Sequence, residues 1–238
     1  MLSLDAQNKW RDEYRKRHPG WRPATEVFAE QVHENLRPHS RLLDVGCGRG
    51  GLVEQLEHPL SQAVGIDPDF FSLAEHRLEN LPRAVALSDH LPFVNDVFDI
   101  VIASWLLEHL PNPVSTFQAI GRVLRPGGVF IFITPNKRHP LTVANRFVGR
   151  LGSLQGRLVA RLYGRAPEDT FSTFYRANTA TELHDLTTSA GLVTESITMI
   201  ADPSYVAFNR LLFHGMSAID KGLPQDRQIH IVGVARKI

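Results

Sequence analysis

The sequence predicts an α/β fold with a mostly parallel sheet. Short apolar, β-branched runs recur along the chain, segments with helical periodicity separate them, and a glycine-rich turn follows the first run. Apolar strands that alternate with helices are typical of a sheet that is covered on both faces. The expected strands are residues 41–45, 63–66, 83–87, 99–103, 129–134, 192–199 and 228–235.

The expected helices lie between these strands. Residues 52–57 are helix-like, and residues 68–81 begin with Pro68 at the first helical position. Residues 113–124 precede the pair Gly127-Gly128, and residues 182–190 precede Gly191. We expect one domain, with an N-terminal helical cap (1–38), a core (41–134), a helical insertion (137–178) and the last part of the sheet (179–238).

Composition narrows the class of protein. The 238 residues are 43% hydrophobic, which is too apolar for a disordered chain. The single cysteine, Cys47, allows no internal disulfide and no cysteine metal cluster. Charges fill the first thirty residues, and no apolar run approaches the roughly 20 residues of a membrane span. We expect a cytoplasmic protein, with peripheral membrane contact left open.

Positive charge is concentrated in two segments, although the net charge is only +1. Residues 9–22 hold six Lys/Arg against two Asp/Glu, and residues 137–165 hold seven Lys/Arg and no acid. In the second segment an apolar stripe at helical spacing runs beside arginines. A helix with these two stripes can lie on an anionic membrane surface or cover a pocket for an amphiphile. The alternative is an ordinary lid helix that packs on the domain. The stripe consists of Phe147, Leu151, Leu154, Leu158 and Leu162, and the arginines are Arg146, Arg150, Arg157 and Arg161.

The glycine-rich turn is the predicted ligand site. Gly46, Gly48 and Gly50 follow the first strand, where a chain without Cβ atoms turns sharply and lets a ligand lie against the backbone. With Gly51 the turn also satisfies the dinucleotide pattern GxGxxG, and Asp67 ends the next strand where a ribose-binding acid is expected. From these residues alone, either a nicotinamide dinucleotide or another nucleoside cofactor fits.

Six segments together resemble class I S-adenosylmethionine (SAM) dependent methyltransferases. The resemblance is strongest to the branch that contains ubiquinone and menaquinone biosynthesis methyltransferases and related small-molecule and lipid enzymes. It implies a Rossmann-like, doubly wound, mostly parallel seven-stranded sheet with a helical insertion after the fifth strand. The segments are residues 43–50 (LDVGCGRG), 65–67 (GID), 91–93 (LPF), 98–101 (FDIV), 107–110 (LEHL) and 122–128 (RVLRPGG).

The resemblance also implies roles for single residues. The loop with Gly46, Cys47, Gly48 and Gly50 would face the carboxypropyl and sulfonium part of SAM. Asp44 would organise this loop or meet the ligand's amino group. The remaining expected cofactor residues are Asp67 with its neighbour Pro68 at the ribose, Ser104 near the methionine part, and Ser88 or Asp89 at the adenine.

The adenine position departs from the family pattern. The family places an acid four residues before Leu-Pro-Phe, and this chain has Leu87 there. Either Asp89 reaches the adenine from two residues later, or the backbone of Ser88 reads it. Asp89 as a simple solvated loop acid is the alternative.

The implied reaction is in-line methyl transfer from SAM, with S-adenosylhomocysteine as product and no metal. An acceptor that starts protonated needs a base, and His109 is the candidate because its pKa lies near neutrality. A packing role for His109 is the alternative. The expected acceptor is small or lipid-like, an anionic membrane surface could meet residues 137–165, and a homodimer is left open.

Three other functions compete with this interpretation. An NAD(P)-dependent oxidoreductase shares the glycine pattern, but it does not account for the later motifs. An RNA or DNA methyltransferase would place its basic segments on phosphates. Against it, residues 103–106 lack the Asn/Asp-Pro-Pro-aromatic signature, and Cys47 already belongs to the cofactor loop. A non-catalytic SAM-binding protein is the third alternative.

Overall fold

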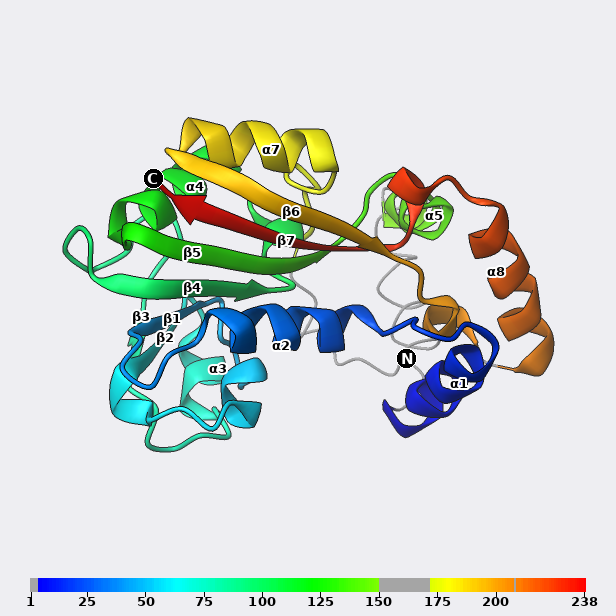
Figure 1. The fold of residues 1–238 in the computed structure, drawn as a ribbon, viewed down its shortest axis with the longest axis horizontal. Helices are drawn as coiled ribbons and strands as arrows, with labels where there is room; N and C mark the ends of the chain where they lie inside the picture. The colour runs from blue at the N-terminus through cyan, green and yellow to red at the C-terminus, as the bar shows by residue number, and fades with distance from the viewer. Residues whose placement is uncertain (1–3, 150–171, 208) are drawn as a thin grey trace.

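A computed structural model describes residues 4–149, 172–207 and 209–238 of the chain. Its centre is a seven-stranded sheet in the order β3-β2-β1-β4-β5-β7-β6 (Figure 1). The predicted α/β class and Rossmann-like topology are confirmed. The strands are β1 (Leu42–Val45), β2 (Ala63–Asp67), β3 (Arg83–Val85), β4 (Phe98–Ser104), β5 (Leu124–Pro135), β6 (Leu192–Ile200) and β7 (His230–Lys237).

The pairing of the strands places the site. Strands β1 to β5 all run parallel to one another, and β7 is antiparallel to both β5 and β6. The chain first builds outward from β1 to β3 and then returns to place β4 on the other side of β1. The loops after β1 and β4 therefore diverge at the carboxyl edge, where sheets of this kind bind their ligands.

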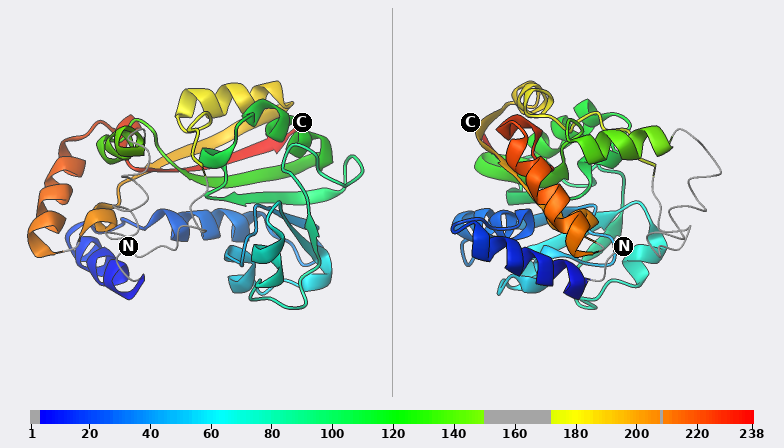
Figure 2. Two further views of the ribbon diagram at one scale, coloured as in Figure 1. Left: turned by 180° about the vertical axis from the view of Figure 1, so that it is seen from behind. Right: turned by 90° about the vertical axis from the view of Figure 1, so that its right-hand side faces the viewer.

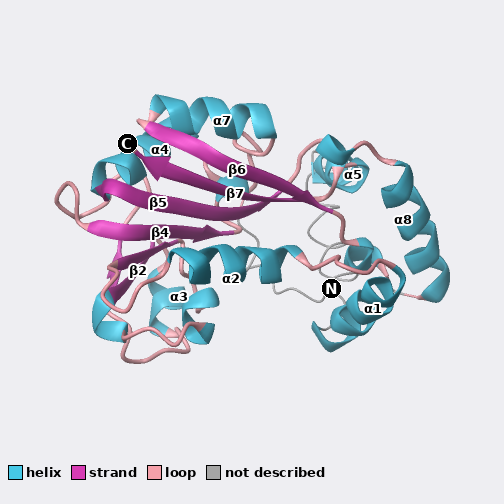
Figure 3. Cartoon of the chain, viewed as in Figure 1, coloured by secondary structure: helices cyan, strands magenta, loops and turns pink. Residues whose placement is uncertain are grey.

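Helices cover both faces of the sheet (Figure 3). Helix α2 (Ala24–Asn35) packs Phe28 and Val32 with isoleucines of β4 and β5 that point to its face. Helices α4 (Pro113–Val123) and α7 (Ala180–Ser189) cover the opposite face, where Phe117 packs edge-on against Phe130, with centroids 5.4 Å apart. Because successive side chains of β5 point to opposite faces of the sheet, the strand contributes to two separate hydrophobic cores.

Four helical elements of the described chain, called the cap from here on, lie beyond the carboxyl ends of the parallel strands (Figures 1 and 2). It contains α1 (Leu4–Arg17), α5 (Pro140–Gly149), the 3₁₀ turn η5 (Pro203–Val206) and α8 (Arg210–Gly222). Trp10 stacks on Phe213 at 4.7 Å, and Arg11 donates to the buried Asp202 carboxylate at 2.8 Å. These contacts join the first helix to the last third of the chain.

The remaining connections are short turns. They are the 3₁₀ turns η1 (Leu52–Gln55), η2 (Leu60–Gln62), η3 (Leu107–His109) and η6 (Gln225–Arg227). The predicted helix-like piece at 52–57 is therefore a 3₁₀ turn.

The helix predicted at residues 68–81 is much shorter than expected. Helix α3 spans only Phe70–Ala74, and Asp69, not Pro68, precedes it as the N-cap and accepts from the Ser72 amide at 3.1 Å. After Ala74 the chain turns back toward the glycine loop, where the Arg77 amide donates to the Arg49 carbonyl at 3.0 Å. A tertiary contact that periodicity does not encode therefore ends the helix.

Strand β5 begins at Leu124, five residues before the predicted start. Leu124 pairs with Phe98, and the register shifts before Ile100 pairs with Val129. Gly127, with φ +79°, lies inside this irregular start, so the glycine pair bends a strand and does not end the helix α4.

Most of the predicted arginine-flanked stripe lies outside the described residues. Of the basic segment 137–165, the structure describes residues 137–149, and in them Lys137 pairs with Glu182 and Arg138 with Asp226. No helix in the described parts of the chain is long and apolar enough to cross a bilayer.

Candidate cofactor site

The turn after β1 adopts the conformation that its glycines permit. Gly46, Gly48 and Gly50 have φ values of +78°, +50° and +117°, which side chains rarely tolerate. The amides of Gly46 and Cys47 both donate to the Ile66 carbonyl, at 2.8 and 3.0 Å. A Cβ on Gly46 would lie 3.0 Å from Leu106, a residue of the loop after β4. The turn is thus closely packed between the loops that follow β2 and β4.

Asp67 connects this turn to the end of β2. Its Oδ2 accepts from the Gly48 amide at 3.0 Å, and its Oδ1 accepts from the Asp69 amide at 2.9 Å. A carboxylate has about four acceptor positions, so two amide bonds leave capacity for two hydroxyl donors. The side chain is half-buried and fits the expected grip on the two hydroxyls of a ribose.

Asp44 is a buried carboxylate with an unmet hydrogen bond. It is 3% exposed, and among the described residues its Oδ1 has no partner. Burial, with the nearby charge of Asp67, raises the pKa of Asp44 to about 7. A cationic donor at this carboxylate would satisfy the orphaned oxygen and restore its charge. The ammonium group of SAM is such a donor, so the residues present fit this cofactor.

Cys47 contributes only backbone to the turn. Its side chain is 5% exposed and rests where Gly65 lacks a Cβ, because an added Cβ would lie 2.6 Å from Sγ. Burial is the largest cause that raises the pKa of the thiol, and the charges of Asp44 and Asp67 act in the same direction. The thiol is therefore a packing group and a poor nucleophile.

The residues expected at the adenine have other partners. The Ser88 hydroxyl lies 3.0 Å from that of Thr116, and Asp89 pairs with His90 at 2.8 Å. Around the ends of β2 and β3 the exposed side chains are apolar instead. They are Phe70, Phe71, Val85 and Leu87, each more than half exposed, and Pro68 is exposed beside them.

The candidate base His109 lies in the 3₁₀ turn after β4, and its Nδ1 lies 3.0 Å from the Ser172 carbonyl. Glu108 beside it is the more enclosed group. Burial raises the pKa of Glu108 to about 7, and the Thr134 hydroxyl donates to its Oε2 at 3.2 Å. Asn178 donates in turn to the Thr134 oxygen at 2.7 Å, which directs the hydroxyl proton toward Glu108.

Sequence reasoning missed two features of this edge. One is the inward direction of Glu108, because a single sequence does not show which of the adjacent residues Glu108 and His109 points into the protein. Trp105 follows Ser104 with φ +55°, an unusual conformation for a bulky residue, and its ring contacts His230 with centroids 5.0 Å apart. No local signal marks either feature, since both depend on how the loop after β4 meets β5 and β7.

Known proteins agree with this geometry. A family model described as a methyltransferase domain matches residues 14–197, which is more than half of the chain. This chain belongs to the methyltransferase domain family. The expected resemblance to methyltransferases is therefore confirmed, and the relatives that follow extend it to the ubiquinone branch.

Curated relatives are similar to part of this chain. It is 32% identical over 167 residues to a ubiquinone biosynthesis O-methyltransferase of Pseudomonas fluorescens, covering 66% of each chain. It is 34% identical over 116 residues to the enzyme of the same name from Aeromonas salmonicida, covering 46% of this chain and 48% of that one. The alignments thus span between about half and two thirds of these relatives.

The fold is similar to that of a SAM-dependent methyltransferase from Mesorhizobium loti. The TM-score is 0.56 at 16% identity, and the match covers 90% of this chain and 100% of the other. At this identity the likeness concerns the fold.

Proposed function

We propose that this chain transfers the methyl group of SAM to a small or amphiphilic acceptor. The observation that carries the proposal is the pair of carboxylates at the glycine turn. Asp67 holds the turn while keeping acceptor capacity, and Asp44 keeps one buried oxygen without a partner among the described residues.

Each part of the cofactor has a matching group in this site. Asp67 would receive the ribose hydroxyls, and Asp44 would receive the ammonium group. The backbone of Gly46 and Gly48 would lie against the carboxypropyl chain, and the end of β4 at Ser104 would border the methionine part. The apolar rim that contains Phe70 and Leu87 suits one face of an adenine. Asp89 and Ser88 stay candidates for its amino group.

When bound, SAM supplies a methyl group already activated on a sulfonium sulfur. In such a transfer the acceptor atom would form its bond to the methyl carbon as the carbon–sulfur bond broke, and the product would be S-adenosylhomocysteine. The protein's part is to align these atoms and exclude water, which in favourable systems contributes up to about 7–11 kcal/mol.

A hydroxyl acceptor must also lose a proton. His109 is the proposed base, and Glu108 is a second candidate, since its raised pKa and its position beside Thr134 at the end of β5 suit a proton acceptor near pH 7. Oxygen as the accepting atom is suggested by the O-methyltransferases among the relatives.

The deciding experiment is mass spectrometry of a cell extract incubated with the protein and isotopically labelled SAM. We expect label in one or a few small or lipid-soluble compounds, and much less of it with the Asp67→Ala protein at a limiting SAM concentration. Label in RNA or DNA would point to a polynucleotide acceptor. SAM binding without any transfer would point to a non-catalytic protein.

Two further expectations remain proposals. One is contact between an anionic membrane and residues 137–165, although Lys137 and Arg138 already pair with acids of this chain. The other is a homodimer.

A further inference from the structure

Helix α8 presents three distinct faces. At about 100° per residue, Phe213, Met216 and Asp220 fall on one side, and all three are buried. A second side carries Arg210, His214 and Lys221. The third side is apolar yet open to solvent, with Leu211 81%, Leu212 46% and Ile219 49% exposed. Packing against the rest of the chain does not explain why this third side is apolar, because it is exposed to solvent.

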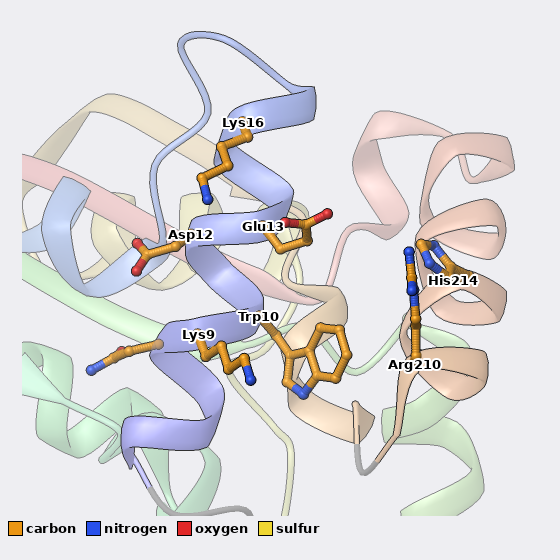
Figure 4. Close-up of a pocket in the computed structure, with 8 residues that line it drawn as sticks. Lys9, Trp10, Asp12, Glu13, Lys16, Arg210 and His214 are labelled. Carbon is orange, nitrogen blue, oxygen red and sulfur yellow. The ribbon is translucent and has the colours of Figure 1, made fainter.

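A groove separates the cationic side of α8 from α1. Its volume is about 660 Å³, and Lys9, Trp10, Lys16, Arg210 and His214 are among its lining residues (Figure 4). Figure 4 shows Lys9 and Trp10 on α1 across from Arg210 and His214 on α8. The groove lies in the cap, apart from the glycine turn (Figure 1).

Two acids, Asp12 and Glu13, also line this groove, and both have cationic neighbours on α1. Asp12 lies 3.8 Å from Arg15, and Glu13 pairs with Arg17 at 2.6 Å. Among the described residues, Lys9, Lys16, Arg210 and Lys221 form no ion pair.

The other basic residues of segment 9–22 are paired. Arg11 pairs with Asp202, Arg15 with Glu26 and Arg22 with Glu30. Of the six basic residues in segment 9–22, only Lys9 and Lys16 therefore form no ion pair within the described parts of the chain, and both line the groove.

We propose that the groove and the apolar side of α8 form a docking face for an anionic phospholipid bilayer. Lipid phosphates would meet the unpaired cations, and Leu211, Leu212 and Ile219 would enter the boundary between headgroups and acyl chains. Adjacent cationic and apolar stripes are the pattern of helices that lie in this interface. Charge complementarity favours anionic lipid, since each Lys or Arg near such a surface contributes about fivefold in affinity.

The position of this face suits a lipid-like acceptor. The cap that carries it lies beyond the carboxyl ends of the parallel strands (Figures 1 and 2). The proposed cofactor site lies at the same edge of the sheet. An acceptor dissolved in the bilayer would enter from the docked side. The docking face itself does not depend on the proposed methyl transfer.

Flotation of the full chain with lipid vesicles tests the proposal. We expect binding to phosphatidylcholine vesicles that contain phosphatidylglycerol, weak binding to phosphatidylcholine alone, and loss of binding at high salt. At low salt, Lys16→Gln/Arg210→Gln should weaken binding at least tenfold, and Leu211→Ser/Ile219→Ser should weaken it although every cation is still present.

Matched controls change equally exposed residues elsewhere. Arg37→Gln/Arg41→Gln removes two cations just before β1, at the opposite edge of the sheet, and Val193→Ser removes an apolar side chain that is 49% exposed on β6. Both should bind vesicles like the unchanged protein. The stabilisation of each variant by SAM reports on the cofactor site separately.

Two results would overturn the proposal. One is the absence of binding to anionic vesicles by the unchanged protein. The other is full binding by both the Lys16→Gln/Arg210→Gln and the Leu211→Ser/Ile219→Ser proteins. That result would place the membrane contact at residues 137–165 or elsewhere. Capture of RNA instead of vesicles would assign the cations to a polynucleotide.

Discussion

If Asp44 receives the ammonium group of SAM as proposed, cofactor affinity should depend on pH. Its pKa in the free protein is raised to about 7 by burial and by Asp67, so the carboxylate is mostly protonated at pH 6 and ionised at pH 8. Only the ionised form attracts an ammonium group. Affinity for SAM should therefore rise as pH rises through about 7 and fall again above about 8, where an α-amino group loses its proton.

Calorimetric titration across this range measures the effect. The Asp44→Asn protein should bind more weakly at pH 7.5 and lose the rise near pH 7. A rise that persists in this variant would remove Asp44 from the ammonium site.

Asp67 and Gly48 should each be needed for binding SAM. Asp67→Ala removes an ionised acceptor whose hydrogen bonds are each typically about 1.5–3 kcal/mol, so affinity should fall at least about tenfold. Gly48→Val places a β-branched residue at φ +50° and should cost about 1–3 kcal/mol in backbone strain. The exposed Asp185→Ala on α7 is the control. Calorimetry that finds the affinity unchanged in both site variants would contradict this assignment.

The choice between Glu108 and His109 is open to a kinetic test. If Glu108 is the base, kcat rises with pH through about 7 and the Glu108→Gln protein loses both this rise and most of its rate, with little change in the KM for SAM. The Gln variant keeps an acceptor for the Thr134 hydroxyl. If His109 is the base, His109→Gln loses most of the rate and Glu108→Gln keeps it.

At the scale of elements, the buried pair of Arg11 and Asp202 holds α1 to η5. The Asp202 side chain has no exposed surface, so removing its cation leaves a buried charge with a lost partner. Arg11→Met should lower the free energy of unfolding by about 3 kcal/mol, or the melting temperature by about 6–12 °C. Thermal melts measure this effect.

The double change Arg11→Met/Asp202→Leu should recover part of the loss, because no buried charge then remains. Arg22→Met removes an exposed ion pair with Glu30 and should change nothing measurable. A loss as large in this control would show that the melt reports surface charge and not the buried contact.

The elements that sequence reasoning located best are those that local patterning determines. Helix α4 ends at Val123, one residue from its expected end, because its apolar face matches the helical period. Helix α3 stops early because the Arg77 amide bonds to Arg49 in another loop. Such long-range contacts leave no trace in a local pattern, and the same reason hid the inward direction of Glu108.

For the whole molecule, ligand binding should raise thermal stability selectively. A ligand that binds only the folded chain at about 100 times its Kd adds about 2.7 kcal/mol, or about 5–11 °C for a domain of this size. SAM and S-adenosylhomocysteine should produce such a shift, and NAD should not. A shift with NAD alone would favour an oxidoreductase site at the same glycine turn.

The α/β class and the mostly parallel sheet were predictable because the glycine turn, Asp67 and the later motifs follow one another in the same order as in the family they resemble. The antiparallel place of β7 between β5 and β6 was not part of the prediction. The charge distribution was not. Segment 9–22 is basic in sequence, yet its arginines pair with Asp202, Glu26, Glu13 and Glu30 in the folded chain. Only three-dimensional neighbours decide which cations stay available to a partner.

The contact between Arg11 and Asp202 also sets an order of events during synthesis. These residues are 191 positions apart in the chain. At roughly 5–20 residues per second a ribosome needs about 10–40 s to make that stretch, so α1 emerges long before its partner exists. Strands β1 to β5 can pair during this wait, whereas α1 meets its partner only once Asp202 has been made.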